Sequence, residues 1–465
     1  MRGVIACGGY MPYHRLRRAA IGEVVPGAGG QGTRSVASFD EDTTTMGVEA
    51  ARLALRGAPD GISPDTLWFS TVVPAYLDKT NATGVHAALR LPPEVPAFDG
   101  IGSVRSASGT LRAALLGSDA TLVVAADLRS GLPGSRDEAD GGDGASALLV
   151  GGGDRVIAEY LGGASVTDEF VDRWRTPGDN RSKVWEERFG ETKYLELGQE
   201  AWKRALAETD LAPGDVTRVA VSGTHARAVR TAGSKLGAKE IVDDLSATVG
   251  NTGAAHPGLL LSGAIEQSSP GDVLALVVLA DGADVFLFRA TEALASYRPA
   301  RPVAGQIAGG GEIPYGKFLA WRGMLPVEPP RRPEPSRISA SAAARAADWK
   351  YGFVGSKDRS TGAVHLPPSR VSREGGAVDD MEPVPMAERQ GTIATFTVDR
   401  LVYSPSPPVV FAVVDFDDGG RFPVELTDVD PEAVAIGDRV EMTFRRMFTA
   451  DGLHNYFWKA RPVRA

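Results

Sequence analysis

Two polar residues, each following an apolar run, are the clearest candidates for chemistry in this chain. His225 lies in V-S-G-T-H-A-R-A, and Asn251 follows 26 residues later in V-G-N-T-G-A-A-H-P-G. An imidazole and a carboxamide at the ends of two neighbouring strands could donate two hydrogen bonds to one carbonyl oxygen. A histidine near its ordinary pKa could also carry a proton. Gly250 and Gly253 would let the backbone approach a ligand closely.

Each of these residues also has a structural interpretation. His225 could cap a helix or lie at the surface where a strand ends. Asn251 could occupy a left-handed turn position, as asparagine often does in N-T-G sequences. The pairing of the two motifs favours the functional interpretation, whereas His256, further along the same loop, is expected to be structural.

The two motifs resemble the second half of thiolase-fold condensing enzymes, especially ketoacyl synthase III and 3-hydroxy-3-methylglutaryl-CoA synthase. The resemblance implies that His225 and Asn251 hold the oxygen of an acyl thioester, carried by coenzyme A or by an acyl carrier protein. It also implies a cysteine nucleophile at the N-terminus of a buried helix, where the helix dipole lowers the thiol pKa.

That cysteine is missing from the corresponding segment, residues 98–115, which reads F-D-G-I-G-S-V-R-S-A-S-G-T-L-R-A-A-L. Alignment on Asp99 puts the cysteine position at Val104, and alignment on Gly109 and its neighbour puts it at Ser106. Neither residue is a cysteine, so the chain departs from the resembling enzymes at their nucleophile.

A serine could replace the cysteine only with help. Because a hydroxyl has a far higher pKa than a thiol, Ser106 or Ser108 would need an adjacent base such as His225. The alternative, that both serines only cap the helix, is favoured. We still expect Val104 and Ser108 to line the substrate site. The single cysteine, Cys7, lies in the first strand and turn and is expected to be buried and inert.

A second departure affects the acid of the resembling synthase. The run W-F-S-T-V-V-P-A-Y-L-D-K-T-N-A-T resembles the synthase loop that carries a catalytic glutamate upstream of an Asp-Lys pair. Asp78 and Lys79 match the pair, but Val72 and Val73 stand where the glutamate is expected. Hydroxymethylglutaryl-CoA synthesis as such is therefore not expected.

The elements that position these residues follow an α/β pattern over the first 295 residues. Apolar runs predict strands at 4–8, 66–72, 121–126, 145–150, 218–221, 273–280 and 284–289. Amphipathic stretches predict helices at 44–56, 81–89, 109–116 and 195–208. The runs L-V-V-A-A-D and L-V-V-L-A-D-G-A each lead into a further apolar strand, although two such hairpins can also be similar by chance. We predict a duplicated, five-layer thiolase-like fold with halves at 1–160 and 161–295.

The rest of the chain has three further parts. Residues 296–349 are rich in Pro, Arg, Gly and Ser and predict a linker, with an aromatic docking helix at 314–325. Residues 350–385 resemble a zinc ribbon without its cysteines. Residues 386–465 contain five strand-like runs and predict a small OB-fold barrel. This barrel resembles the OB domain of the DUF35 family, whose members accompany thiolase-fold proteins and bind acyl-CoA.

No zinc is expected in the ribbon-like part. The ligand positions fall near Asp358, Thr361, Ser372 and Gly375, and only His365 lies nearby. Without thiolates a tetrahedral zinc site is not supported. We expect an irregular extension packed on the thiolase half, or partial disorder.

Composition excludes several classes of protein. The net charge of −9 argues against nucleic-acid binding. No apolar run approaches the length that spans a bilayer, and the apolar stretch at the N-terminus is too short for a signal peptide and predicts a first strand and turn. One cysteine allows no intrachain disulfide and suggests the cytoplasm. The resemblance implies a homodimer, or a heteromer with another thiolase-fold subunit.

Two functions remain open. The first is a thiolase-superfamily enzyme that works on acyl-CoA or carrier-bound acyl thioesters without a cysteine, by acyl transfer, condensation or retro-aldol cleavage. The second is a non-catalytic scaffold or partner subunit of an acyltransferase complex. Retention of the His225 and Asn251 motifs favours the enzyme slightly.

Overall fold

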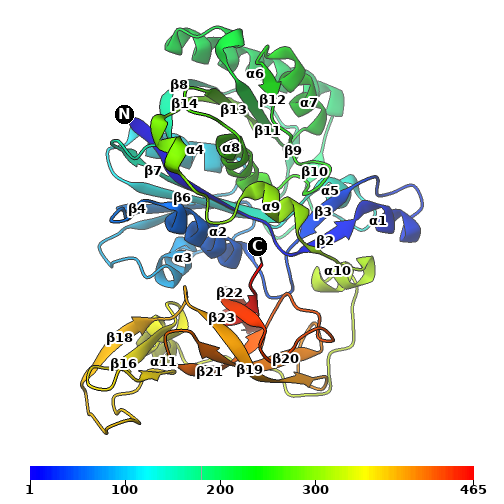
Figure 1. Cartoon of the computed structure of the whole chain (residues 1–465). Coiled ribbons are helices and arrows are strands. Elements are labelled where there is room, and N and C mark those ends of the chain that lie inside the picture. The colour runs from blue at the N-terminus through cyan, green and yellow to red at the C-terminus, as the bar shows by residue number, and fades with distance from the viewer. Residues whose placement is uncertain (180, 465) are drawn as a thin grey trace. The chain divides into compact units, whose positions relative to one another are not determined.

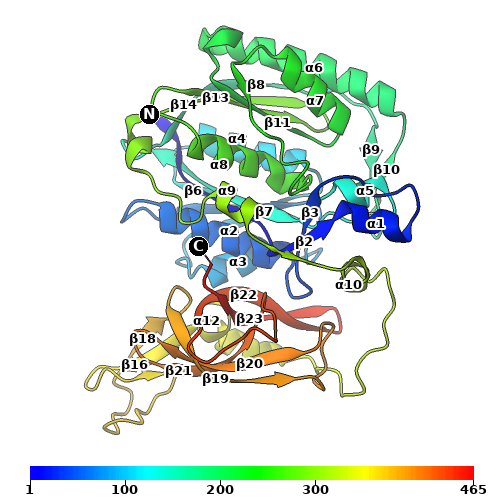
Figure 2. The same cartoon turned by 45° about the vertical axis from the view of Figure 1, so that its right-hand side comes forward.

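The computed structural model describes residues 1–179 and 181–464. The chain forms two compact units. The first consists of Met1–Ala37, Glu49–Thr83 and Pro93–Leu319, and the second of Ser38–Val48, Gly84–Pro92 and Ala320–Ala465. The second unit therefore takes two short segments from a stretch of sequence that otherwise builds the first. Figures 1 and 2 show the elements of both.

A ten-stranded sheet organises the described part of the first unit, in the order β12-β11-β13-β14-β8-β1-β7-β6-β4-β5. The two sets of five strands meet where β8 pairs with β1. Counted from the outer edge of the sheet, each set begins with two parallel strand pairs, and two antiparallel pairs follow toward the centre. The strands are β1 (Arg2–Tyr10), β4 (Thr66–Thr71), β5 (Ala97–Ile101), β6 (Thr121–Asp127), β7 (Gly144–Gly152), β8 (Ala158–Val166), β11 (Arg218–Gly223), β12 (Glu240–Ile241), β13 (Val273–Leu279) and β14 (Ala283–Ala290). The predicted duplication is confirmed by this repeated pattern.

Helices lie between and outside the two sets of strands (Figure 2). The central helices are α4 (Arg105–Leu116) and α8 (His256–Glu266). α8 is apolar on all sides and buried from His256 to Ile265, because it packs on strands of both sets. α6 (Glu187–Thr209) and α7 (Ala226–Lys235) cover the outer face of the second set. The result is the layered α/β architecture predicted from the sequence.

Shorter elements complete both units. They are β2 (His14–Arg17), α1 (Arg18–Val24), β3 (Thr33–Val36), α2 (Thr43–Gly57), α3 (Ala82–Ala88), α5 (Arg136–Asp140), β9 (Arg173–Trp174), β10 (Lys183–Val184), η1 (Pro213–Asp215), η2 (Gly253–Ala255), η3 (Glu292–Ser296), α9 (Val303–Ala308), β15 (Gly311–Glu312), α10 (Tyr315–Trp321), α11 (Ala340–Arg345) and α12 (Ala347–Lys350). Within the segment predicted to be a docking helix, Tyr315 of α10 donates a hydrogen bond to Glu138. No helix in the described ranges is both long and apolar enough to cross a bilayer.

The second unit contains a closed five-stranded barrel in the order β19-β20-β21-β23-β22. Its strands are β19 (Gln390–Asp399), β20 (Val409–Phe416), β21 (Arg421–Leu426), β22 (Arg439–Ala450) and β23 (Leu453–Pro462). Closure leaves no free edge within the barrel. Aromatic rings fill its interior. The ring centroids of Phe353 and Phe416 lie 5.9 Å apart, and those of Phe444 and Trp458 lie 5.4 Å apart.

Residues 354–385 form a three-stranded sheet instead of the expected irregular extension, and they cluster with the barrel rather than with the thiolase half. The strands are β16 (Val354–Asp358), β17 (Val364–His365) and β18 (Met381–Pro385). Hydrogen bonds connect Asp358 and Ser372, two positions near which the resemblance places zinc ligands. Hydrogen bonds from Ser372 and Ser360 lower the pKa of Asp358, and His365 Nε2 lies 3.3 Å from Ser372 Oγ. These hydrogen bonds stabilise the turns of the segment.

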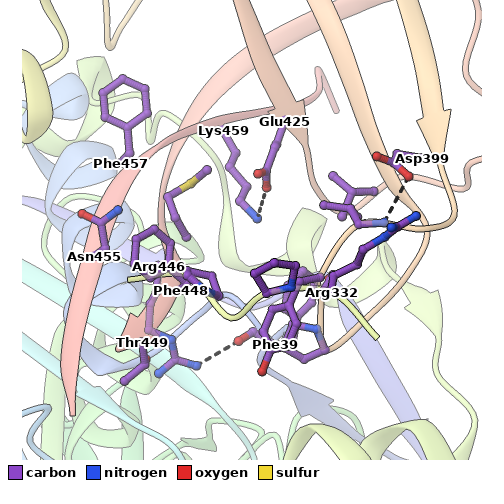
Figure 3. A pocket seen from close by; sticks show the side chains of 18 of the residues that line it. Phe39, Arg332, Asp399, Glu425, Arg446, Phe448, Thr449, Asn455, Phe457 and Lys459 are labelled. Atoms are coloured by element: carbon purple, nitrogen blue, oxygen red, sulfur yellow. Dashed lines mark hydrogen bonds and ion pairs between the residues drawn. The ribbon is translucent and has the colours of Figure 1, made fainter. Parts of the chain in front are cut away.

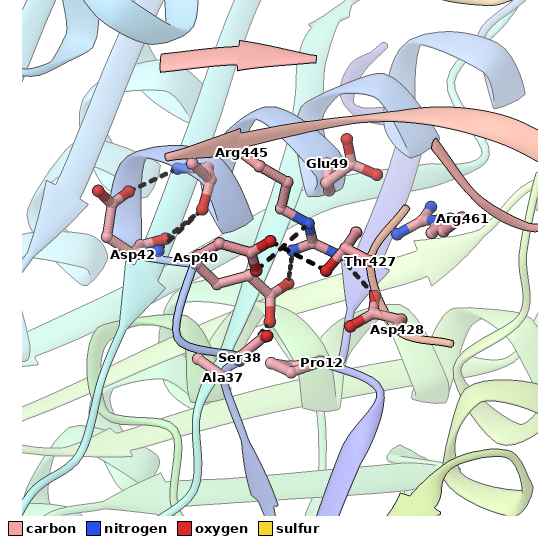
Figure 4. A network of polar contacts seen from close by, with 12 residues as sticks. Pro12, Ala37, Ser38, Asp40, Asp42, Glu49, Thr427, Asp428, Arg445 and Arg461 are labelled. Atoms are coloured by element: carbon pink, nitrogen blue, oxygen red, sulfur yellow. Dashed lines mark hydrogen bonds and ion pairs between the residues drawn. The ribbon is translucent and has the colours of Figure 1, made fainter. Parts of the chain in front are cut away.

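Buried charges join Ser38–Val48 to the barrel strands within the second unit (Figure 4). Arg445 of β22 is fully buried, contacts Glu41, and lies 2.7 Å from Asp428. Lys459 of β23 lies 3.0 Å from Asp40. Because an unpaired buried charge is costly, these acidic residues and basic strand residues depend on one another.

Candidate active site

A cavity of about 410 Å³ lies in the first unit, where the chain leaves β6 and β11. Loops at the carboxyl ends of strands are the usual place for ligands in α/β folds. The lining residues are Arg129, Ser130, Arg136, Asp137, Asp140, Gly141, Asp172, Arg173, Val184, Trp185, Glu187, Thr224, His225, Ala226 and Asn251. His225 and Asn251, predicted from the sequence to act together, thus share one cavity.

His225 is the N-cap of α7 and is 6% exposed. Its Nδ1 accepts a hydrogen bond from the Ala228 N–H at 3.2 Å. Its Nε2 lies 2.9 Å from the Glu187 carbonyl oxygen, to which it donates. Both nitrogens are therefore satisfied by backbone groups, and the imidazole is held in one orientation at the wall of the cavity.

Asn251 is fixed just as firmly. Its Nδ2 donates to the Gly223 carbonyl at 2.7 Å, and its Oδ1 accepts from the Gly253 N–H at 2.9 Å. Its backbone pairs with the segment around Gly141, since its N–H donates to the Asp140 carbonyl and its carbonyl accepts from the Gly142 N–H, both at 2.9 Å. A primary amide has two N–H groups, and within the described residues only one is used, so the other is free for a ligand.

The residues of the nucleophile segment do not line this cavity within the described chain. Val104 is buried in the apolar core as the N-cap of α4. Ser106 Oγ lies 3.4 Å from the Ile101 carbonyl, and Ser108 Oγ is buried without a hydrogen-bond partner among the described residues. Neither hydroxyl contacts His225, whose Nδ1 is already occupied, so the structure gives no support for a serine activated by this histidine.

The two glycines beside Asn251 have positive φ and allow close packing of protein against protein. A Cβ at Gly253 (φ +58°) would lie 2.1 Å from Asp127 Oδ2. A Cβ at Gly250 (φ +84°) would lie 2.5 Å from the Gly141 carbonyl oxygen. Their small size is thus needed to place the Asn251 loop, whereas the sequence interpretation assigned it to ligand approach.

Asp127, which the sequence analysis did not single out, connects this loop to β4. Its carboxylate accepts hydrogen bonds from Thr71 Oγ1 at 2.9 Å, Val72 N at 2.8 Å and Ala254 N at 2.6 Å. Burial raises its pKa. Val72, at the position where the glutamate of the resembling synthase is expected, therefore shares the Asp127 carboxylate with the Asn251 loop.

Charged side chains that were also not predicted form the rest of the cavity wall. Arg173 pairs with Asp137 through two contacts of 2.8 Å. Arg136 lies 3.0 Å from Asp140 and 3.2 Å from Glu187. No sequence signal marks these residues, because charged side chains are common in loops and their pairing depends on the fold.

The chain is similar to known condensing enzymes over most of its length. It is 29% identical to the hydroxymethylglutaryl-CoA synthase of Aeropyrum pernix over 343 residues, which cover 70% of this chain and 95% of that protein. It is 28% identical to the Pyrococcus furiosus enzyme of the same name over 294 residues, 60% of this chain and 83% of that protein. Residues 384–445 match the family model described as the C-terminal OB-fold domain of ChsH2.

Solved structures agree with the architecture. An HMG-CoA synthase complexed with CoA superimposes with a TM-score of 0.56 at 18% identity, covering 68% of this chain and 89% of that chain. MvaS in complex with 3-hydroxy-3-methylglutaryl coenzyme A gives 0.56 at 22% identity, covering 72% and 94%. The first unit is thiolase-like, and the barrel is an OB-fold. Both parts of the predicted fold class are confirmed.

The OB-fold unit contains a cavity of its own, of about 1080 Å³ (Figure 3). Six half-buried aromatic side chains line it: Phe39, Trp349, Tyr403, Phe422, Phe448 and Phe457. Lys459 lies 2.8 Å from Glu425 in its wall, so these two charges are paired. Half-exposed rings around one cavity suit a flat or apolar ligand group.

Proposed function

We propose that this chain acts on acyl thioesters of coenzyme A or of an acyl carrier protein, without a cysteine nucleophile. The observation that carries the proposal is the placement of His225 and Asn251 in the wall of one cavity of a thiolase-like unit. The similarity to hydroxymethylglutaryl-CoA synthases supports the choice of substrate.

The chemistry that suits this cavity is carbon–carbon bond cleavage or formation next to the thioester carbonyl. Such a step needs a stabilised enolate oxygen and a proton carrier, but no covalent acyl-enzyme. The free N–H of Asn251 is the first donor for that oxygen. His225 Nε2–H is the second, once a ligand oxygen competes with the Glu187 carbonyl for it. Condensation and retro-aldol cleavage pass through the same enolate, so one site serves both directions.

The second candidate is a non-catalytic partner subunit of a thiolase-type acyltransferase complex. The observation that favours it is that both ring nitrogens of His225 are bonded to the backbone, as in a helix cap. Such a subunit would bind acyl-CoA, or bind no thioester, and would show no turnover in either case.

A cleavage assay separates the two functions. Purified full-length chain is incubated with 3-hydroxy-3-methylglutaryl-CoA or 3-hydroxybutyryl-CoA, and acetyl-CoA release is followed by mass spectrometry. For the enzyme, we expect turnover that falls about 100-fold in Asn251→Ala, the usual loss for one oxyanion donor, and also falls in His225→Ala. His86→Ala, outside the cavity, is the control. Absence of turnover in the wild type, or equal rates in all variants, contradicts the enzymatic proposal. A stable acyl group on Ser106 would instead indicate covalent catalysis.

We further propose that the chain works as a homodimer or with a second thiolase-fold subunit. Among the described strands β5 ends the sheet and pairs only with β4. It exposes Phe98 (47%) and Ile101 (37%). An unpaired edge with exposed apolar side chains is a surface that another chain can cover.

A further inference from the structure

Asp172 is a buried carboxylate that the proposed function has not yet used. It lies between β8 and β9, is 4% exposed and lines the cavity with His225 and Asn251. Its Oδ1 has no hydrogen-bond partner among the described residues. Burying an unsatisfied carboxylate oxygen is costly, and such groups in folded proteins usually have a functional reason.

The fold leaves room for this carboxylate beside His225. A Cβ at Gly190 of α6 would lie 2.3 Å from Asp172 Oδ1 and 3.3 Å from His225 Cδ2. The absence of a side chain at Gly190 therefore allows the carboxylate and the imidazole to approach the same point. α6 begins over this site and supplies both Gly190 and the Glu187 carbonyl that holds His225.

Charge pairing in the cavity wall isolates Asp172 further. The other acidic residues of the wall pair with Arg136 or Arg173. Within the described chain, no ion pair or hydrogen bond is made by the Asp172 side chain. The groups that act on it electrostatically are His225 and Arg173, which favour the carboxylate, and Asp281 and Glu187, which oppose it. Burial is the largest effect and raises the pKa of Asp172, as a proton carrier requires.

Asp172 also comes from a segment that contacts the place where the synthase glutamate is missing. Arg175, three residues further on, donates from Nη2 to the Val72 carbonyl at 2.5 Å. Val72 is one of the two residues that stand in the glutamate's expected position. The loop that carries Asp172 therefore also contacts this position, through Arg175.

We propose that Asp172 is the proton acceptor and donor of the thioester reaction, an inference that rests on the proposed function. In the cleavage direction, its carboxylate takes the proton from the 3-hydroxyl of a 3-hydroxyacyl thioester. The C2–C3 bond breaks, its electron pair forms the enolate held by Asn251, and C3 becomes a carbonyl carbon. The proton then passes from Asp172 to C2, so the step balances without a further reactant.

Asp172→Asn tests this role, since it keeps the shape of the side chain and removes the charge. We expect kcat for acetyl-CoA release from 3-hydroxy-3-methylglutaryl-CoA to fall by about 100- to 10,000-fold, the usual range for loss of a general acid–base. Asp172→Glu should recover part of the activity. In the wild type, kcat should fall as pH decreases through an apparent pKa above that of a free aspartate, and this limb should disappear in Asp172→Asn. Asp168→Asn is the matched control, because Asp168 lies in the same loop, is exposed and pairs with Lys193.

The outcomes separate this inference from the proposed function. Wild-type turnover that is impaired in Asn251→Ala but retained in Asp172→Asn overturns the role of Asp172 alone. No wild-type turnover on either thioester overturns both. If Asp172→Asn does not fold, Gly190→Ala takes its place, because the added methyl displaces the carboxylate without removing it. Full activity in Gly190→Ala would likewise contradict the proposal.

Discussion

At the scale of single residues, the cavity of the thiolase-like unit is held by hydrogen bonds to backbone groups. His225, Asn251 and Asp127 each bond to main-chain atoms of a different element, α6, β11 and η2 respectively. This arrangement fixes their positions before any ligand arrives, which is the condition for electrostatic stabilisation of a developing charge. Because of the same bonds, each of the three residues also stabilises the fold, in addition to its candidate functional role.

Two other titratable residues, Cys7 and Glu266, lie outside the cavity of the thiolase-like unit. Cys7 is buried, as the sequence predicted, and burial raises the pKa of its thiol to about 12, so it is not a nucleophile at neutral pH. Glu266 at the end of α8 accepts a hydrogen bond from the Val303 N–H at 2.8 Å, and burial raises its pKa to about 7.

Glu266 should therefore make stability depend on pH. The folded state binds the proton more tightly than the unfolded state, so stability is highest below the ordinary glutamate pKa and falls as pH rises through about 7. From pH 5 to pH 8 this amounts to about 2 kcal/mol. Glu266→Gln should lose less stability than the wild type over that interval in urea unfolding, whereas Glu94→Gln, at an exposed position, should follow the wild type. Equal pH dependence in all three proteins would show that Glu266 is not the cause.

At the scale of elements, most of the first unit could be predicted from its hydrophobic pattern. Each strand predicted within the first 295 residues ends within two residues of its observed end. β8 was missed because A-E-Y-L-G-G-A-S-V is interrupted by glycines, and α7 because it follows His225 directly in a polar run. α6 starts eight residues before its predicted start, because Gly190 and several charged residues interrupt the amphipathic pattern over its first turns.

The site itself could be predicted only in part. His225 and Asn251 lie in motifs of recognisable spacing, so their shared cavity was accessible from the sequence. Asp172 lies in a loop without any motif, and the ion pairs made by its neighbours leave its Oδ1 without a partner among the described residues. Ser106 was a candidate because of its position in the chain, but the fold turns that part of α4 toward other residues.

The barrel strands β22 and β23 provide an energetic test at this scale. Replacing Arg445 by Met leaves Glu41 and Asp428 buried without their cation, and we expect a loss of about 3–5 kcal/mol in the free energy of unfolding. Thr443→Val on the same strand is the control. Its Oγ1 is buried and has no hydrogen-bond partner in the described part of the chain, so its removal should cost little. Chemical denaturation followed by circular dichroism measures both. A loss below about 1 kcal/mol for Arg445→Met would contradict the importance of this network.

At the scale of the whole molecule, the free edge of β5 makes assembly testable. We expect wild-type protein to elute as a dimer in size-exclusion chromatography with light scattering. Phe98→Asp should shift it to a monomer, because a carboxylate would be buried in the paired edge. Val24→Asp, which also alters an exposed apolar residue, should leave the dimer intact. A monomeric wild type would show that β5 does not pair in solution.

The barrel unit includes two segments from the N-terminal part of the chain, Ser38–Val48 and Gly84–Pro92, and this affects how the unit can be expressed on its own. A gene fragment that starts in the linker would encode every barrel strand, yet it would omit Glu41 and Asp40 and leave Arg445 and Lys459 with only Asp428 and Glu425 as acidic partners. Each of these two buried cations would lose one of its acidic partners in the truncated product. The two modules, which look like a simple fusion when read along the gene, have become inseparable by a single cut.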